Sequence, residues 1–321
     1  MVIDYEVILA TFNGSNYIVE QLNSIASQSI PPSRIIISDD NSSDDTLAVA
    51  HLWSSQSKIP VTFMPKVYKN LGCCRNFERL LDFSTTQYVM IADQDDVWEV
   101  CKAEYLFEEI FRLEKNSFGT QMPLLVYSDL KLVDQNGKFL FNSFYSHQNI
   151  NPLKNDFLSL AIQNVVTGCT CLVNQECIGA ALPFPDSVIL HDWWLGLVAS
   201  KLGQLSFISL PLVNYRQHDA NLVGSKSFYR LFLDKLNLLL HYHSIDDFMD
   251  MRLAQLNVLL NRFGEPNSQH CLLVNKLFSA NPLARFISAL RLRLSCHGAI
   301  RTVVFYVFLF IWNPRVSKIC I

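Results

Sequence analysis

The 321-residue sequence predicts an α/β protein, with a mostly parallel sheet flanked by helices and a helical C-terminal extension. Three observations predict this class. Short apolar runs alternate with segments of helical length over the first hundred residues, and two of these runs end directly in clusters of aspartate. From about residue 225 onward, only helical apolar spacing remains. We therefore expect a sheet-containing domain over residues 1–224 and a helical region over residues 225–321.

The first region opens with strands and helices in alternation. Each expected strand is a short run of apolar, often β-branched residues, and turn-forming residues or prolines separate the elements. The expected strands are Glu6–Thr11, Arg34–Ser38, Val61–Met64 and Tyr88–Ala92, and the expected helices are Tyr17–Ser27, a segment through Ala50, and Asn76–Leu81. Strands that alternate with helices lie parallel and are covered on both faces, so the pattern indicates a Rossmann-like sheet.

The rest of the chain is more mixed. Strands are expected at Leu124–Asp129, within Val165–Val173 after a loop around Gly168, and at Leu212–Arg216, with a turn at Asp134–Gly137. Helices are expected at Asp156–Ile162, from His191 to about Lys201, at Phe228–His241 and at Phe248–Phe263. The last strand is followed directly by Gln217 and His218, which matters for the site considered below.

Composition limits the class of protein. Half of the residues are apolar and 17% are charged, values typical of a globular chain and not of a disordered one. The net charge of −3 gives no electrostatic basis for binding nucleic acid. The N-terminus has no signal-peptide pattern, and the nine cysteines have no zinc-site spacing, since Cys73 and Cys74 are adjacent and Cys169 and Cys171 are two apart. We expect free thiols in a reducing cytoplasm.

Two acidic clusters lie where strands end. Asp39 and Asp40 follow one expected strand, and Asp93 and Asp95 follow another. Ligands of open α/β sheets bind beyond the carboxyl ends of the strands, and Mg²⁺ or Mn²⁺ is held there by one or two carboxylates together with phosphate oxygens. Neither cluster has the glycine and glutamate of a calcium-binding EF-hand loop. The alternative is helix capping, by Asp95 or Asp96 in front of a helix that would begin near Trp98.

Two further groups have chemistry but no specific pattern. The His191-Asp192 pair opens an expected helix, and His218 follows the last strand. Taken alone, these residues would be read as a helix cap and a packed histidine. They become candidates for a site only if the fold brings them to the acidic clusters.

Nine segments in sequence order resemble those of a known family. They are ILATFNGSNYIVEQLNSI, IIISDDNSSDDT, NLGCCRNFERLL, IADQDDVW, LVYSDLKLVD, VVTGCTCLVN, ALPFP, HDWWLGLVAS and YRQHDANLVG, which together run from about Val7 to Gly224. With this order and spacing, the chain resembles the family 2 glycosyltransferases of the GT-A fold, and in particular their bacterial rhamnosyltransferase-like branch. Each segment alone is a weak signal, and the set is specific.

The resemblance implies a role for each matched residue. The nucleotide-sugar site would comprise Thr11 and Asn13 beside the nucleotide, Asp39 or Asp40 on the base, Asp93 near the ribose, and Gly168 where donor sugar and acceptor meet. Asp95 and His218 would hold Mg²⁺ or Mn²⁺. Asp192 would be the general base, with His191 in place of the family's usual glutamate or threonine.

The implied reaction is inverting transfer of a sugar from a nucleotide donor to a saccharide or lipid-linked acceptor, in the synthesis of O-antigen or capsule. The resemblance points to dTDP-rhamnose as the donor, and UDP-glucose or UDP-galactose are the alternatives. A glycoside hydrolase would need no metal-diphosphate site, and a nucleotidyltransferase carries a basic, glycine-rich N-terminal loop that ATFNGSNY lacks. A binding protein without activity is the non-enzyme alternative.

The C-terminal region ends in a continuously apolar segment, Val303–Trp312. Four arginines precede it and two basic residues follow it, namely Arg285, Arg291, Arg293, Arg301, Arg315 and Lys318. The segment is shorter than the roughly 20 residues that span a bilayer, and its pattern is typical of a helix lying in the membrane interface. A last core helix is the alternative. We expect an enzyme in the cytoplasm, in peripheral contact with the inner face of the cell membrane.

Overall fold

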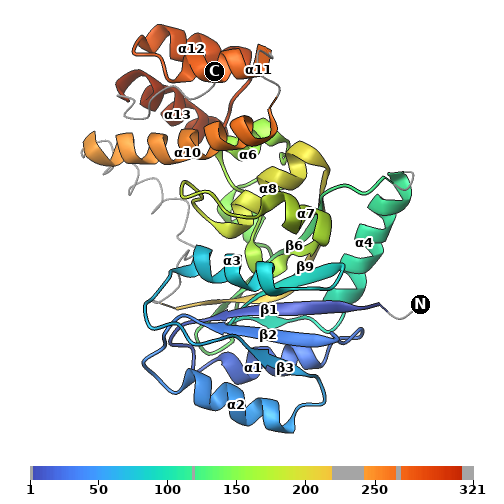
Figure 1. Cartoon of the computed structure of the whole chain (residues 1–321). Helices are drawn as coiled ribbons and strands as arrows, with labels where there is room; N and C mark the ends of the chain where they lie inside the picture. Colours follow the sequence, from blue (N-terminus) through green and yellow to red (C-terminus); the bar gives the residue numbers. More distant parts are fainter. Residues whose placement is uncertain (1–2, 118–119, 219–241, 265–268, 313–321) are drawn as a thin grey trace. The chain divides into compact units, whose positions relative to one another are not determined.

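The computed structural model describes residues 3–117, 120–218, 242–264 and 269–312 (Figure 1). The chain divides into two compact units. The first, here called the sheet unit, comprises Met1–Phe144, Val166–Phe184 and Leu190–Ser225, and the second, the helical unit, comprises Tyr145–Val165, Pro185–Ile189 and Lys226–Ile321. The helical unit thus takes two segments from the chain before residue 224.

The sheet unit is built on one nine-stranded sheet. In spatial order its strands are β3 (Val61–Phe63), β2 (Arg34–Asp39), β1 (Tyr5–Thr11), β4 (Tyr88–Asp93), β8 (Leu172–Asn174), β6 (Leu124–Asp134), β9 (Gln204–Gln217) and β5 (Val97–Trp98), and β7 (Phe139–Phe141) pairs with β6. The first four are parallel, as are β6 and β9, whereas β8, β5 and β7 run antiparallel to their neighbours. The predicted α/β class with a mostly parallel sheet is confirmed.

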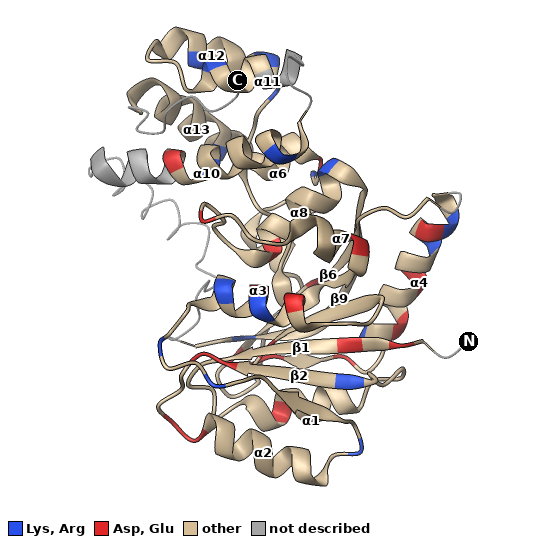
Figure 2. Cartoon of the chain, viewed as in Figure 1, with Lys and Arg blue, Asp and Glu red and all other residues tan. Residues whose placement is uncertain are grey.

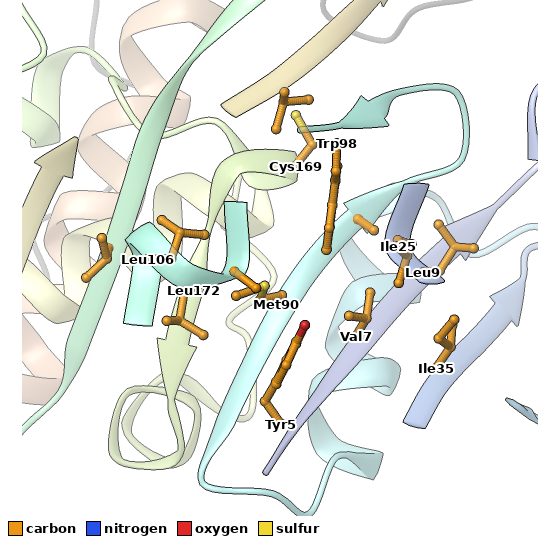
Figure 3. Close-up of a cluster of buried hydrophobic side chains, with 14 of the residues drawn as sticks. Tyr5, Val7, Leu9, Ile25, Ile35, Met90, Trp98, Leu106, Cys169 and Leu172 are labelled. Carbon is orange, nitrogen blue, oxygen red and sulfur yellow. The ribbon is translucent and has the colours of Figure 1, made fainter. Parts of the chain in front are cut away.

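Helices cover both faces of the parallel strands. They are α1 (Ile18–Ala26), α2 (Thr46–Gln56), α3 (Cys73–Phe83), α4 (Lys102–Asn116), α7 (Gln175–Ala181) and α8 (His191–Leu202). Figure 1 shows α3 on the face opposite to α1 and α2. One face of β1 contributes Tyr5, Val7 and Leu9 to a buried cluster with Ile25 of α1 and Leu106 of α4 (Figure 3). Successive side chains of a strand point to opposite faces, and Val7, Ile8 and Leu9 are all buried, so apolar core lies on both sides of the sheet.

One expected element is wrong. A helix was expected to begin near Trp98, with Asp95 or Asp96 as its cap, but Val97 and Trp98 form strand β5 and α4 begins only at Lys102, after Cys101. Trp98 pairs with Val213 of β9, and its amide donates to Ser24 Oγ at 3.0 Å. Because these partners are far away in the sequence, the local pattern could not reveal the strand. The capping interpretation of the two aspartates is therefore excluded.

The helical unit contains α6 (Phe157–Ile162), α10 (Tyr242–Phe263), α11 (Gln269–Leu277), α12 (Pro282–Arg291) and α13 (Ala299–Ile311), together with most of α5 (Phe144–Gln148). Asp156 caps α6 by accepting from the Ser159 amide, so the helix expected there is confirmed. The helix expected at Phe228–His241 lies outside the described residues. No helix in the described part of the chain is long and apolar enough to cross a membrane.

Two of the four arginines expected in a basic stretch are instead buried in the helical unit. Arg285 donates to the carbonyl oxygens of Leu309 and Trp312 at 2.7 and 2.8 Å, and Arg301 donates to those of Gln148 and Asn149 at 2.6 and 2.9 Å. These guanidinium groups complete hydrogen bonds that the ends of helices leave open. The charge predicted for the outer surface is therefore smaller than the sequence suggested.

The expectation of free thiols is confirmed for the side chains that the structure describes. Cys73, Cys74, Cys101, Cys169, Cys171, Cys177 and Cys296 are free thiols. Cys169, Cys171 and Cys177 are buried. Buried thiols of this kind behave as small apolar groups.

Candidate active site

The sheet register places the two acidic clusters at one edge. Thr11 at the end of β1 lies opposite Asp39 of β2, and Ala10 lies opposite Asp93 of β4. Thr11 Oγ1 donates to Asp39 Oδ2 at 2.9 Å, which ties the ends of the two strands together. Both clusters therefore lie at the carboxyl edge of the parallel strands, where ligands of such sheets bind.

The loop after β1 is held by the loop after β2. Asn13, with φ of 50°, accepts from the Ser43 amide at 2.8 Å through its side-chain oxygen, and its own amide donates to Ser42 Oγ at 2.8 Å. Asp39 Oδ1 accepts from the Ser42 amide at 2.8 Å. Thr11, Asn13 and Asp39 thus form one connected network.

Asp40 is held differently from Asp39. It is buried, and its two carboxylate oxygens accept from the amides of Leu71 and Gly72 at 2.6 and 2.8 Å. Asp40 thereby fixes the loop that leads into α3. Asp39 is only half-buried and is hydrogen-bonded to the loop after β1 and its own loop.

Asp95 and His218 are in direct contact, although 123 residues separate them. His218 Nε2 lies 2.8 Å from Asp95 Oδ2, and the His218 ring stacks on Tyr17 with 5.1 Å between ring centroids. Only 11% and 13% of the two side chains is exposed. One carboxylate oxygen and one imidazole nitrogen at this distance form a donor pair suited to a divalent cation such as Mn²⁺ or Mg²⁺.

Asp93 and Asp96 form a second acidic group with Cys169. Their ligating atoms all lie within 4.8 Å of one another. Burial, reinforced by the charges of Asp95 and Asp192, raises the pKa of Asp93 to about 7, and burial raises the pKa of Asp96 well above its usual value. Asp96 Oδ1 accepts from the Arg216 amide at 3.1 Å, whereas Asp96 Oδ2 has no hydrogen-bond partner within the described chain. Such crowding of acids favours a bound cation or a shared proton.

A buried ammonium group lies beside these acids. Lys102 Nζ donates to the carbonyl oxygen of Cys169 at 2.6 Å and lies 3.3 Å from the centre of the Trp98 ring. Burial lowers the pKa of Lys102 to about 7, although the charges of Asp96 and Asp93 oppose that shift. Lysine in the first turn of a helix opposes the helix dipole. That unfavourable position is the sequence signal that could have found Lys102, which the sequence analysis missed together with Asp96.

Asp192 and Gly168 are in direct contact. The Gly168 amide donates to Asp192 Oδ2 at 2.9 Å. Asp192 lies in the first turn of α8, and Gly168 begins a 3₁₀ turn at Gly168–Thr170. A Cβ atom on Gly168 would lie 2.6 Å from His191 Nε2, so a larger residue would displace that ring. The site thus needs glycine because the two segments approach so closely.

His191 is a neutral, packed side chain. Its ring stacks on Phe77 with 3.9 Å between ring centroids, and burial lowers the pKa of His191 to about 3. It therefore adds no positive charge beside Asp192. After burial and the charge of Asp95, the charge of Asp192 is a further cause that raises the pKa of Asp93.

The geometry defines a class of protein before any comparison. An α/β sheet with acidic side chains at its carboxyl edge, an Asp–His pair and a further carboxylate held by a glycine amide is suited to binding a nucleoside diphosphate and a cation. Residues 6–155 match the family model described as glycosyl transferase family 2. Over these residues, the chain is therefore similar to the family 2 glycosyltransferases.

Individual glycosyltransferases are similar to this chain in sequence and in structure. The chain is 28% identical over 243 residues to the dTDP-rhamnosyl transferase RfbG of Shigella flexneri, which covers 72% of this chain and 78% of that protein. The S. aureus TarS 1–349 structure with UDP has a TM-score of 0.53 at 16% identity, over 96% of this chain and 88% of that one. The mannosyltransferase PcManGT of Pyrobaculum calidifontis, in complex with GDP-Man and Mn²⁺, has a TM-score of 0.52 at 14% identity, over 94% and 78%. These structures show the GT-A fold.

Proposed function

We propose that this chain is an inverting glycosyltransferase that moves a sugar from a nucleotide donor to a saccharide or lipid-linked acceptor. The observation that carries the proposal is the division of carboxylates at one sheet edge. Asp95 contacts His218 at 2.8 Å, whereas Asp192 belongs to a different element, the first turn of α8, where it accepts from the Gly168 amide. Inverting transfer needs this separation, because the acceptor and the leaving group occupy opposite sides of the anomeric carbon.

Each group has a role in that reaction. Asp192 takes the proton of the acceptor hydroxyl as its oxygen attacks the anomeric carbon, and the Gly168 amide keeps the carboxylate oriented. Thr11 and Asn13 line the nucleotide, and Asp39 or Asp40 accepts a hydrogen bond from the base.

The diphosphate end of the donor needs positive charge. We assign Asp95 and His218 as the residues that hold Mg²⁺ or Mn²⁺, with Asp93 beside the ribose. The bound cation would stabilise the negative charge of the leaving diphosphate. Asp96 Oδ2, which has no hydrogen-bond partner among the described residues, is an oxygen that a cation beside Asp93 could engage.

The donor we propose is dTDP-rhamnose, since RfbG is named as a dTDP-rhamnosyl transferase. UDP-glucose or UDP-galactose is the alternative. The acceptor would be a lipid-linked oligosaccharide at the cytoplasmic face of the membrane, in the synthesis of O-antigen or capsule.

Calorimetric binding of nucleoside diphosphates and their sugars, with Mn²⁺, Mg²⁺ or EDTA, tests the proposal. We expect dTDP to bind only with a divalent cation, and Asp95→Ala to weaken this binding by at least about tenfold, with Asp82→Ala on the exposed end of α3 as the matched control. Tighter binding of UDP than of dTDP would favour UDP-glucose or UDP-galactose as the donor and would leave the proposed glycosyltransferase class unchanged. Binding of none of these ligands by folded protein would overturn the proposal, and binding without turnover would leave a donor-binding protein.

A further inference from the structure

The last two described helices expose apolar side chains along one face each. On α12, Leu283, Ile287 and Leu290 are exposed and follow the spacing of one helix face. On α13, the exposed residues with such spacing are Ile300, Val303, Val307 and Phe310. Val303 is 63% and Leu283 is 57% exposed. Side chains this large and this exposed indicate that the face has a function other than closing the core.

The two faces form one surface. Phe286 of α12 lies 5.3 Å from the Tyr306 ring and 5.2 Å from the Phe310 ring of α13, measured between centroids. Because Phe310 is itself one of the exposed residues, these ring contacts join the exposed face of α13 to α12. We call this surface, formed by the seven exposed side chains of α12 and α13, the apolar face.

The opposite side of each helix is already occupied. Arg285 of α12 and Arg301 of α13 are buried and donate to backbone carbonyl groups of the helical unit. Phe305, Phe308 and Leu309 are buried as well. Helix α13 therefore has one side packed in the core of the helical unit and one side whose apolar residues are exposed in the described part of the chain.

The charge around the apolar face is of one sign. Residues 266–321 contain seven Lys or Arg and no Asp or Glu, in a chain whose net charge is −3. Among the described residues, Lys276, Arg291 and Arg293 are exposed, and Figure 2 shows no acidic segment on α12 or α13. A second copy of this face would bring no acidic side chain to these basic groups. Anionic phosphate groups would supply the complementary negative charge.

We propose that the apolar face binds the surface of a bilayer that contains anionic phospholipids. The exposed side chains of α12 and α13 enter the interface between headgroups and acyl chains, and Arg291 and Arg293, at the end of α12 and in the turn after it, lie among the phosphates. The proposal deepens the proposed function, on which it rests for the lipid-linked acceptor, by assigning the surface that meets the membrane. Binding to vesicles is independent of donor and acceptor.

Co-sedimentation with vesicles tests this surface. Native protein should bind vesicles of phosphatidylcholine with about one third phosphatidylglycerol, and should bind pure phosphatidylcholine more weakly. The double variant Val303→Glu/Val307→Glu should lose at least about tenfold in vesicle affinity, because charged groups would enter the interface. Leu52→Glu, on the exposed side of α2 at 64% exposure, is the matched control and should bind as the native protein does.

The basic residues give a second variant. Arg291→Gln/Arg293→Gln should weaken binding to the anionic vesicles by about fivefold for each residue, with binding to pure phosphatidylcholine unchanged. Native protein that fails to bind the anionic vesicles, or equal binding by Val303→Glu/Val307→Glu, would overturn the proposal. The proposal would also be overturned if sedimentation velocity showed a dimer for the native protein and a monomer for Val303→Glu/Val307→Glu. Native protein that binds dTDP but no vesicles overturns this proposal alone, and the reverse result overturns the proposed function alone.

Discussion

The sheet unit and the helical unit treat buried charge in opposite ways. In the sheet unit, Asp93, Asp96 and Lys102 lie close together, and one oxygen of Asp96 has no partner among the described residues. In the helical unit, Arg285 and Arg301 each donate to several carbonyl oxygens at the ends of helices. Burying a charge is costly unless hydrogen bonds or opposite charges compensate it.

This difference distinguishes a binding site from a structural core. Charged groups whose hydrogen bonds are all made within a unit stabilise that unit. They have no remaining hydrogen-bonding capacity for a ligand. Carboxylates that crowd together without full compensation have raised pKa values, as Asp93 does at about 7, and a cation or a ligand proton donor would relieve them. We therefore expect changes at the carboxylates of the sheet unit to alter activity first, and changes at the buried arginines of the helical unit to alter stability first.

The largest effect is expected at Asp192. Replacement by Asn should lower kcat by roughly a hundred- to ten-thousand-fold, because an amide cannot accept the hydroxyl proton. The Asn oxygen can still accept from the Gly168 amide, so folding and donor binding should persist. Steady-state turnover and calorimetric donor binding, with the exposed Asp82→Asn as control, would measure both. Equal loss of binding and turnover would show that Asp192 holds the site together instead of acting as the base.

The second effect is expected at Arg285, in the helical unit. Arg285→Met should lower the free energy of unfolding by about 3 kcal/mol or more, because several buried carbonyl groups lose their donor. Arg291→Met on the same helix is exposed and should change stability by less than about 0.5 kcal/mol. Hydrogen exchange of α12 and α13 would locate the loss. If both variants are equally stable, the buried guanidinium group is not a structural element, and the contrast between the units fails.

These assignments show which features the sequence could predict. Apolar runs that end in aspartate predicted β2 and β4 and the acidic sheet edge, since both signals are local. The roles of Trp98 and Arg285 were not predictable, because their partners lie about 115 and 24 residues away. A guanidinium group whose acceptors are backbone carbonyls leaves no trace in the side-chain pattern. Local patterns therefore located the acidic clusters at the strand ends and did not reveal the residues that support them.

A smaller effect should follow from Lys102. Lys102→Met keeps the length of the side chain but removes the donor to the Cys169 carbonyl, so the 3₁₀ turn that carries Gly168 loses one anchor. We expect a loss of about 1–3 kcal/mol in the free energy of unfolding and weaker donor binding. Lys115→Met, at the exposed end of α4, is the matched control. Unchanged stability and binding would mean that the ammonium group does not support the acidic site.

The smallest effect concerns pH and the helical unit. His297 accepts from the Asn151 amide through Nδ1 at 3.3 Å, and burial, with the charges of Lys154 and Arg301, lowers the pKa of His297 to about 4. Because an unfolded histidine titrates near pH 6.5, the unfolded chain binds more protons than the folded chain between about pH 6.5 and 4. The stability of the helical unit should therefore be complete above pH 6.5 and fall as the pH drops to 4.

The variant His297→Asn isolates this contribution. An Asn oxygen can replace Nδ1 as acceptor without titrating in this range, so the loss of protection of the α13 amides against hydrogen exchange between pH 6.5 and 4 should become smaller in the variant. His51→Asn, on the exposed side of α2, should leave the native pH dependence unchanged. If His297→Asn keeps the full pH dependence, the acid-sensitive group of the helical unit is another one, and the stabilising role of compensated charge there would rest on the two arginines alone.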